Sequence, residues 1–158
     1  MFIAAFRRVL LRVHERLNAE GLIWQVSAAG AGLLFGSEHL GDERFSAADV
    51  EYVDDLLLPV AGSATELIAK AARIGAITSE CFLRYGFEVN FSKGKSEAML
   101  FYYGPGSSDL RRRVQSDLQD ATALTTEIGP SVSLRVVSAY KHVGTRMVGS
   151  GTLFHILK

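Results

Sequence analysis

The sequence predicts a single α+β domain in which antiparallel hairpins pack on helices. Three segments carry residues that suit helices, short β-rich runs lie between them, and the links between these runs are short. The chain has 158 residues, of which 48% are hydrophobic and 22% charged, which is enough for one buried core. Parallel crossover connections stay open as an alternative to hairpins at some of the links.

The first predicted element is an amphipathic helix. Apolar residues recur at three- and four-residue steps from Phe2 to Leu17, and arginines and glutamates occupy the opposite arc. Gly21 is predicted to end this helix. The next stretch, from Leu22 to Phe35, is apolar and interrupted by glycines, so it is compatible with two short strands or with a loop packed on the helix. Trp24, within it, is assigned to the core.

The second element is a hairpin within residues 45–60. A β-rich run leads into Asp54-Asp55, and the apolar Leu56-Leu57-Leu58 follows at once. Neighbouring residues of a regular strand point to opposite faces, so the two carboxylates reach one site only if the backbone turns there. We therefore expect the turn at the two aspartates.

The second half of the chain continues the alternation of helices and strand pairs. A helix is predicted from a capping box, Ser63 with Glu66, to Gly86. A strand pair is expected at 87–90 and 96–102, across a polar turn. A short polar helix at 110–118 and β-rich runs at 133–137 and 140–148 complete the prediction. The apolar stripe of the long helix consists of Leu67, Ala71, Ile74, Thr78, Cys81, Phe82 and Tyr85.

The formal net charge of zero conceals an uneven distribution. Residues 38–66 contain eight acids and one arginine, whereas basic residues are in excess on both sides. An acidic centre between basic segments suits a cation site beside an anionic ligand, and it equally suits an exposed acidic loop. The single Cys81 cannot form an internal disulfide, so we expect an intracellular, reducing compartment. No uncharged stretch is long enough to span a membrane.

The paired aspartates are candidate metal ligands. Two adjacent carboxylates at the tip of an apolar hairpin repel each other unless a cation compensates their charge, and carboxylate oxygens suit divalent cations. Aspartate is also common in solvated turns, which is the alternative for this pair.

Three short motifs resemble those of a known family, the reverse transcriptases. Tyr52-Val53-Asp54-Asp55-Leu56 resembles their central catalytic box, an aromatic residue followed by x-Asp-Asp between apolar strands. The motif that follows in reverse transcriptases of retroelements without long terminal repeats is similar to 85–90, which ends in Asn90, together with Gly94-Lys95-Ser96-Glu97. The hairpin that holds the primer in that family resembles Tyr140-Lys141-His142-Val143-Gly144.

The resemblance implies an RNA-directed DNA polymerase palm, of which this chain covers the C-terminal part. It implies that Asp54 and Asp55 are catalytic and bind Mg²⁺ or Mn²⁺, with Tyr52 and Asn90 in support. Lys95 is then placed near the pyrophosphate of the incoming dNTP. The segment 140–144 would bind the DNA primer, paired with an RNA template, through Tyr140, Lys141, His142, Val143 and Gly144.

The chain also departs from the family. The resemblance requires a third carboxylate on an earlier strand and a glycine-rich nucleotide box, and neither is present in the sequence. We therefore expect a palm fragment that is inactive by itself. The alternative is a non-catalytic remnant or interaction domain without a metal site.

The expected organisation is a partial palm over residues 1–130, with the metal hairpin at about 46–60, and a primer-grip hairpin over 131–158 that leads toward a missing thumb. Leu56 to Leu58 and the helix face led by Phe2 and Phe6 would pack against the absent half of the palm. They are therefore expected to expose an apolar face through which the chain self-associates. The family resemblance also implies a nuclear location.

Overall fold

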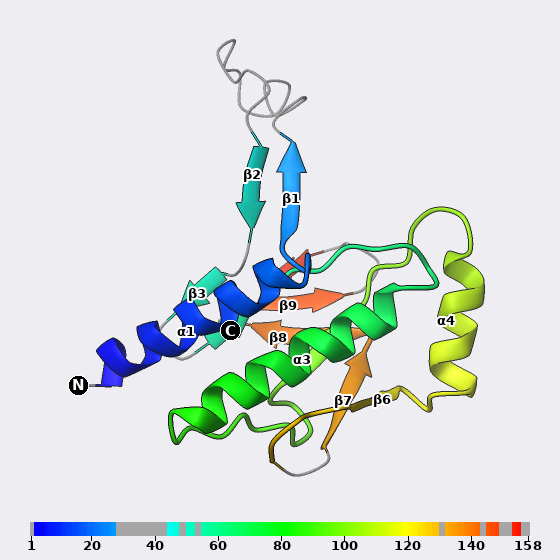
Figure 1. The fold of residues 1–158 in the computed structure, drawn as a ribbon. Helices are drawn as coiled ribbons and strands as arrows, with labels where there is room; N and C mark the ends of the chain where they lie inside the picture. The colour runs from blue at the N-terminus through cyan, green and yellow to red at the C-terminus, as the bar shows by residue number, and fades with distance from the viewer. Residues whose placement is uncertain are drawn as a thin grey trace.

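The fold is α+β, as predicted (Figure 1). The computed structural model describes residues 2–27, 44–47, 50–52, 55–129, 132–142, 145–148 and 153–155. None of the helices within these ranges is long and apolar enough to cross a membrane. In chain order the elements are α1 (Phe2–Ala19), β1 (Trp24–Ser27), β2 (Arg44–Ala47), β3 (Val50–Tyr52), β4 (Asp55–Leu57), α3 (Leu67–Arg84), β5 (Glu97–Met99), α4 (Ser107–Ser116), β6 (Ala121–Leu124), β7 (Val132–Val137), β8 (Ala139–His142), β9 (Thr145–Val148) and β10 (Leu153–His155).

Most strand pairs are antiparallel. The hairpins β1–β2 and β3–β4 each form a two-stranded sheet, and β8, β9 and β10 form an antiparallel sheet with β9 in the middle. The remaining sheet has the order β5–β7–β6, in which β6 is antiparallel to β7 but β5 is parallel to it. The chain crosses from β5 to β7 through α4 and β6, which is the parallel crossover that the sequence left open.

The main hydrophobic core lies between α1 and α3, which pack against each other. Buried residues of α1 meet buried residues of α3, and Leu58 and Val60, which follow β4, pack on them. Phe6 is buried, and its ring meets the ring of Phe82 edge to face, with the centroids 5.7 Å apart. The buried members of this cluster are Val9, Val13, Leu17, Ile74, Ile77 and Cys81.

This packing corrects the expectation of an exposed apolar face. The side chain of Phe6 was expected to need the missing half of the palm, but α3 covers it, since Phe82 supplies the partner. Leu58 likewise packs on the α1–α3 cluster, and Leu56 is half-buried. The side chain of Phe2 lies outside the described residues. Phe6 is therefore covered and Leu56 to Leu58 are partly covered, whereas the predicted self-association itself stays untested.

A second core joins α4 to the rest of the molecule. Leu110 and Val114 lie one turn apart on α4. They pack with Leu67 of α3, with Leu100, which follows β5, and with Val136 of β7. The spacing of four residues places both α4 side chains on one face, so the other faces of this helix meet solvent. A third, smaller cluster of Ala76, Leu124 and Leu134 joins α3 to β6 and β7.

The ends of α1 and α3 are set by glycine, as predicted. After α1, Gly21 has φ +65°, its N–H donates to the Asn18 carbonyl, and the Leu22 N–H donates to the Leu17 carbonyl. After α3, Gly86 has φ +79°, its N–H donates to the Leu83 carbonyl, and the Phe87 N–H donates to the Phe82 carbonyl. This Schellman arrangement requires a left-handed residue, which glycine adopts without steric cost.

The start of α3 is only in part the predicted capping box. The Glu66 carboxylate accepts a hydrogen bond from the Ser63 N–H at 3.4 Å, as the box requires. The Ser63 hydroxyl instead meets the Thr65 hydroxyl at 3.0 Å. The Ser63 contact, assisted by Lys70, holds the pKa of Glu66 below its usual value.

Two local predictions are wrong. Residues 87–90 form no strand. Strand β5 pairs with β7 instead, with Glu97 beside Arg135 and Met99 beside Val137. Trp24 is 43% exposed instead of buried in the core, and the preceding Leu22 and Ile23 pack against the α1–α3 cluster instead.

Candidate functional site

The candidate metal hairpin is an antiparallel strand pair, as predicted. Val50 pairs with Leu57, and Tyr52 pairs with Asp55. Asp55 is thus the first residue of strand β4 and borders the connection between the two strands. Only two residues separate Tyr52 from Asp55, and one of them is Asp54. Asp54 and the Asp55 side chain lie outside the part of the chain that can be described.

Lys95 lies in a turn that is fixed at both ends. At the start, the Asn90 side-chain oxygen accepts a hydrogen bond from the Ser92 N–H at 3.0 Å, and the Asn90 carbonyl accepts one from the Ser96 N–H at 2.9 Å. Gly94 has φ +77°, and the Lys95 N–H donates to the Ser92 carbonyl at 3.0 Å. Lys95 is an exposed residue on this braced turn.

Glu97 connects the Lys95 turn to the sheet. Its carboxylate accepts a hydrogen bond from the Gly94 N–H at 2.9 Å and lies 3.5 Å from Nε of Arg135 on β7. The Glu97 side chain is only 6% exposed. Because the carboxylate contacts both the turn and β7, it fixes the turn relative to the sheet.

The predicted primer-binding segment forms a second hairpin, β8–β9. Tyr140 pairs with Met147, Lys141 with Arg146 and His142 with Thr145. Val143 and Gly144, between the strands, lie outside the described residues. Strand β8 contacts β5, which begins two residues after Lys95. Met99 at the end of β5 pairs with Val137, two residues before β8 begins at Ala139, whereas Lys95 precedes the other end of β5.

No cluster of three or more metal-ligating side chains occurs among the residues that the structure describes. That search does not reach Asp54, so the predicted carboxylate pair is not covered by it. As a donor set, two adjacent aspartates are chemically suited to Mg²⁺ or Mn²⁺, which prefer carboxylate oxygens.

Sequence reasoning missed Glu80 of α3, the most deeply buried charged residue in the part of the chain that the structure describes. Its side chain is 0% exposed, and one carboxylate oxygen lies 2.6 Å from Arg16 of α1. The other oxygen accepts a hydrogen bond from the Glu127 N–H at 2.7 Å. Burial by itself raises the pKa of Glu80, but the Glu127 N–H and the Arg16 guanidinium together lower it below the usual value. The charged Glu80 of α3 therefore connects this helix to α1 and to the loop before β7.

A neighbouring pair strengthens the same interface. Arg73 of α3 donates two hydrogen bonds to the Glu20 carboxylate, at 2.6 and 2.7 Å. The Arg73 hydrogen bonds also hold the pKa of Glu20 below its usual value. The sequence signal for these pairs is weak, because Arg16 and Glu20 lie more than fifty residues from their partners.

Comparisons of the chain with protein-family models, with curated proteins and with solved structures found no match.

Proposed function

We propose that this chain contains the metal hairpin, the pyrophosphate-side lysine and the primer-binding hairpin of an RNA-directed DNA polymerase palm. The observation that carries the proposal is the β3–β4 hairpin, in which Tyr52 pairs with Asp55 and Asp54 lies between them in sequence. Because Asp54 and Asp55 are adjacent in sequence, both belong to the same end of this short hairpin. Such a pair suits a divalent cation better than two separate strand positions do.

Further support comes from the primer-binding hairpin. Lys141 on β8 is paired directly with Arg146 on β9. The register thus gives the hairpin two basic residues at opposite positions of its backbone, and such a pair of positive charges suits a phosphate backbone.

The proposed roles follow the chemistry of nucleotidyl transfer. Asp54 and Asp55 would hold Mg²⁺ or Mn²⁺, which would supply positive charge for the attacking 3′ oxygen of a primer and for the pyrophosphate leaving group. Lys95 would neutralise charge on the pyrophosphate side. Tyr140 to Gly144 hold the primer backbone, which is paired with an RNA template, while a dNTP is the second substrate.

The decisive experiment is a titration of the chain with Mg²⁺, in which backbone NMR records the chemical shifts at each Mg²⁺ concentration. We expect saturable shifts confined to the residues around Asp54, and their loss in Asp54→Asn. Asp42→Asn is the matched control, because it removes one charge from the same acidic segment but not from the hairpin. A flat response contradicts the proposal and favours the remnant without a metal site. Equal loss in both variants shows general attraction to an acidic segment, which also contradicts it.

The chain alone is predicted to be catalytically inactive, because its sequence lacks the third carboxylate that the resemblance requires. Primer extension with an RNA template, a DNA primer and dNTPs tests this directly. Extension by the purified chain that disappears in Asp54→Ala would contradict the predicted inactivity, although it would support the assigned metal site.

A further inference from the structure

The exposed face of α4 carries a cluster of hydrogen-bond donors. A shallow pocket on this helix is lined by Ser108, Arg111, Arg112, Gln115 and Ser116. Every one of these side chains can donate a hydrogen bond, and none is acidic. They lie on the face opposite Leu110 and Val114, which anchor the helix to the core. The cluster is therefore presented to solvent by a helix whose other face is fixed.

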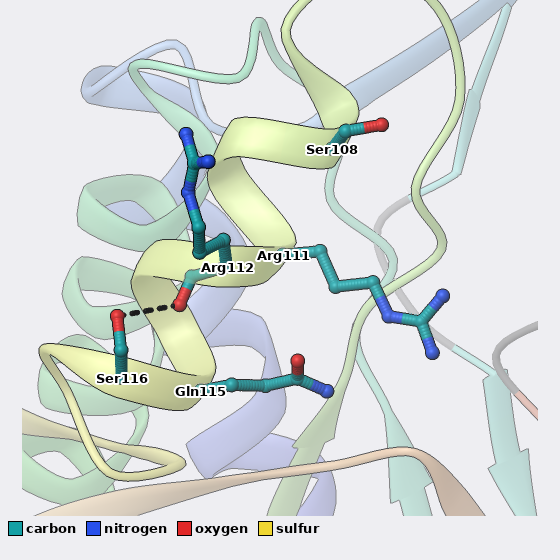
Figure 2. Close-up of a pocket in the computed structure, with 5 residues that line it drawn as sticks. All are labelled: Ser108, Arg111, Arg112, Gln115 and Ser116. Carbon is teal, nitrogen blue, oxygen red and sulfur yellow. Dashed lines mark hydrogen bonds between the residues drawn. The ribbon is translucent and has the colours of Figure 1, made fainter.

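The arginines of this face reach outward in different directions. Figure 2 shows Arg111 and Gln115 extending to one side of the helix and Arg112 to the other. Arg112 is paired with Asp109, an exposed residue one turn earlier. Arg111 has no carboxylate partner among the residues that the structure describes. The Ser116 hydroxyl, with its single hydrogen, lies within donating distance of two acceptors, the Arg112 carbonyl at 2.8 Å and the Asp117 carboxylate at 2.7 Å.

An exposed aromatic segment precedes the same helix. Tyr103 is 71% exposed and Phe101 is 38% exposed, and the loop 104–106 joins them to α4. Tyr102, between them, is half-buried against the α4 core. Burial raises the pKa of Tyr102 and Arg111 opposes that rise, so the Arg111 guanidinium lies within electrostatic reach of the aromatic segment.

Guanidinium groups bind phosphates through planar, paired donors, and exposed aromatic rings stack on unpaired bases. An acidic peptide would use the arginines but would have no need of the aromatic ring. From these observations we propose that α4 and Tyr103 form a binding surface for single-stranded nucleic acid, with Arg111 and Arg112 at phosphates and Tyr103 against a base. The choice of nucleic acid as ligand rests in part on the proposed function.

The test is fluorescence anisotropy of the full chain with a labelled single-stranded RNA of twenty nucleotides at several salt concentrations. The variant Arg111→Gln/Arg112→Gln is compared with Arg7→Gln/Arg8→Gln, a matched control of two adjacent, exposed arginines on α1. The α4 variant is expected to lower the slope of log affinity against log salt by about 1.4, which corresponds to two lost phosphate contacts at ~0.7 each. Tyr103→Ala is expected to lower the affinity at least about fivefold while leaving the slope unchanged.

Several outcomes overturn the inference. The inference is wrong if the chain does not bind RNA. It is also wrong if both arginine variants change the slope of log affinity against log salt equally, because that would show a general charge effect. A labelled polyglutamate peptide that binds as tightly as RNA would assign the surface to an acidic protein partner instead. Circular dichroism checks that each variant keeps its fold.

The outcome is separable from that of the metal experiment. Asp54→Asn is expected to keep full RNA binding through α4, because the hairpin and α4 are different elements. Failure of the Mg²⁺ titration with intact, α4-dependent RNA binding removes the proposed polymerase function alone. Failure of RNA binding with an intact Mg²⁺ response removes this inference alone.

Discussion

Arginines at the α1–α3 interface and on the exposed face of α4 have different surroundings. Arg16 lies 2.6 Å from the fully buried Glu80, and Arg73 forms a two-point contact with Glu20. On α4, by contrast, Arg112 meets only the exposed Asp109, and Arg111 contacts no carboxylate among the described residues. The first set holds two helices together, whereas the second set lies on an exposed helix face.

For the Arg16–Glu80 pair, the physical reason for this difference is the burial of Glu80. A charge removed from water must be compensated by a partner, so the removal of one member of a buried pair is costly. A pair that remains in water gains little, because solvent and salt screen it. The comparison therefore predicts that substitutions in the first region change stability and that those in the second change only binding.

The largest effect is expected for Glu80→Ala. This change leaves Arg16 and the Glu127 N–H without their partner, and we expect a loss of about 4 kcal/mol in the free energy of unfolding. Urea denaturation measures it. Glu15→Ala is the control, since Glu15 forms an exposed pair with Arg12, and its loss should stay below about 0.5 kcal/mol. Equal losses in the two variants would contradict the assigned role of Glu80.

A smaller effect on the free energy of unfolding is expected when the pH is lowered. Because the folded-state pKa of Glu80 is lowered, the folded protein binds fewer protons than the unfolded chain near the ordinary glutamate pKa of about 4.3. The stabilisation from Glu80 is therefore fully present above that pH and is lost as the pH falls toward the lower, folded-state value. Urea midpoints from pH 7 to pH 3 should fall more steeply in the natural protein than in Glu80→Gln. Parallel curves would contradict this prediction.

The smallest effect is expected on α4. Asp109→Asn removes the partner of Arg112 at a site where both side chains are more than three-quarters exposed, so the free energy of unfolding should change by less than about 0.5 kcal/mol. The same change frees the Arg112 guanidinium and lowers the negative charge beside the donor cluster. RNA affinity should therefore rise slightly. A large loss of stability would show that α4 charges serve the fold, which would remove the contrast between the two regions.

Local features of the fold are readable from the sequence. Both long helices have an apolar face at helical spacing and end at glycines, Gly21 and Gly86, that adopt the left-handed conformation. The two candidate hairpins, β3–β4 and β8–β9, follow from short β-rich runs. Each of these signals acts between residues that are close in sequence, which is why periodicity and turn chemistry are enough to find them.

The candidate site was predictable only in part. The strand pairings around Asp55, Tyr140 and Lys141 agree with a hairpin at each motif. The contact of β5 with β8 depends on the parallel pairing of β5 with β7. No local pattern in residues 87–102 distinguishes that pairing from a simple hairpin.

The sequence by itself determined the α+β class, the ends of the two long helices and the positions of the candidate hairpins, because these depend on contacts within a few residues. Tertiary structure alone decided that β5 joins β7, that Trp24 stays exposed and that Glu80 meets Arg16. These outcomes depend on which distant surfaces compete for the same space. In such competition, burial and charge compensation summed over the whole molecule outweigh local preference.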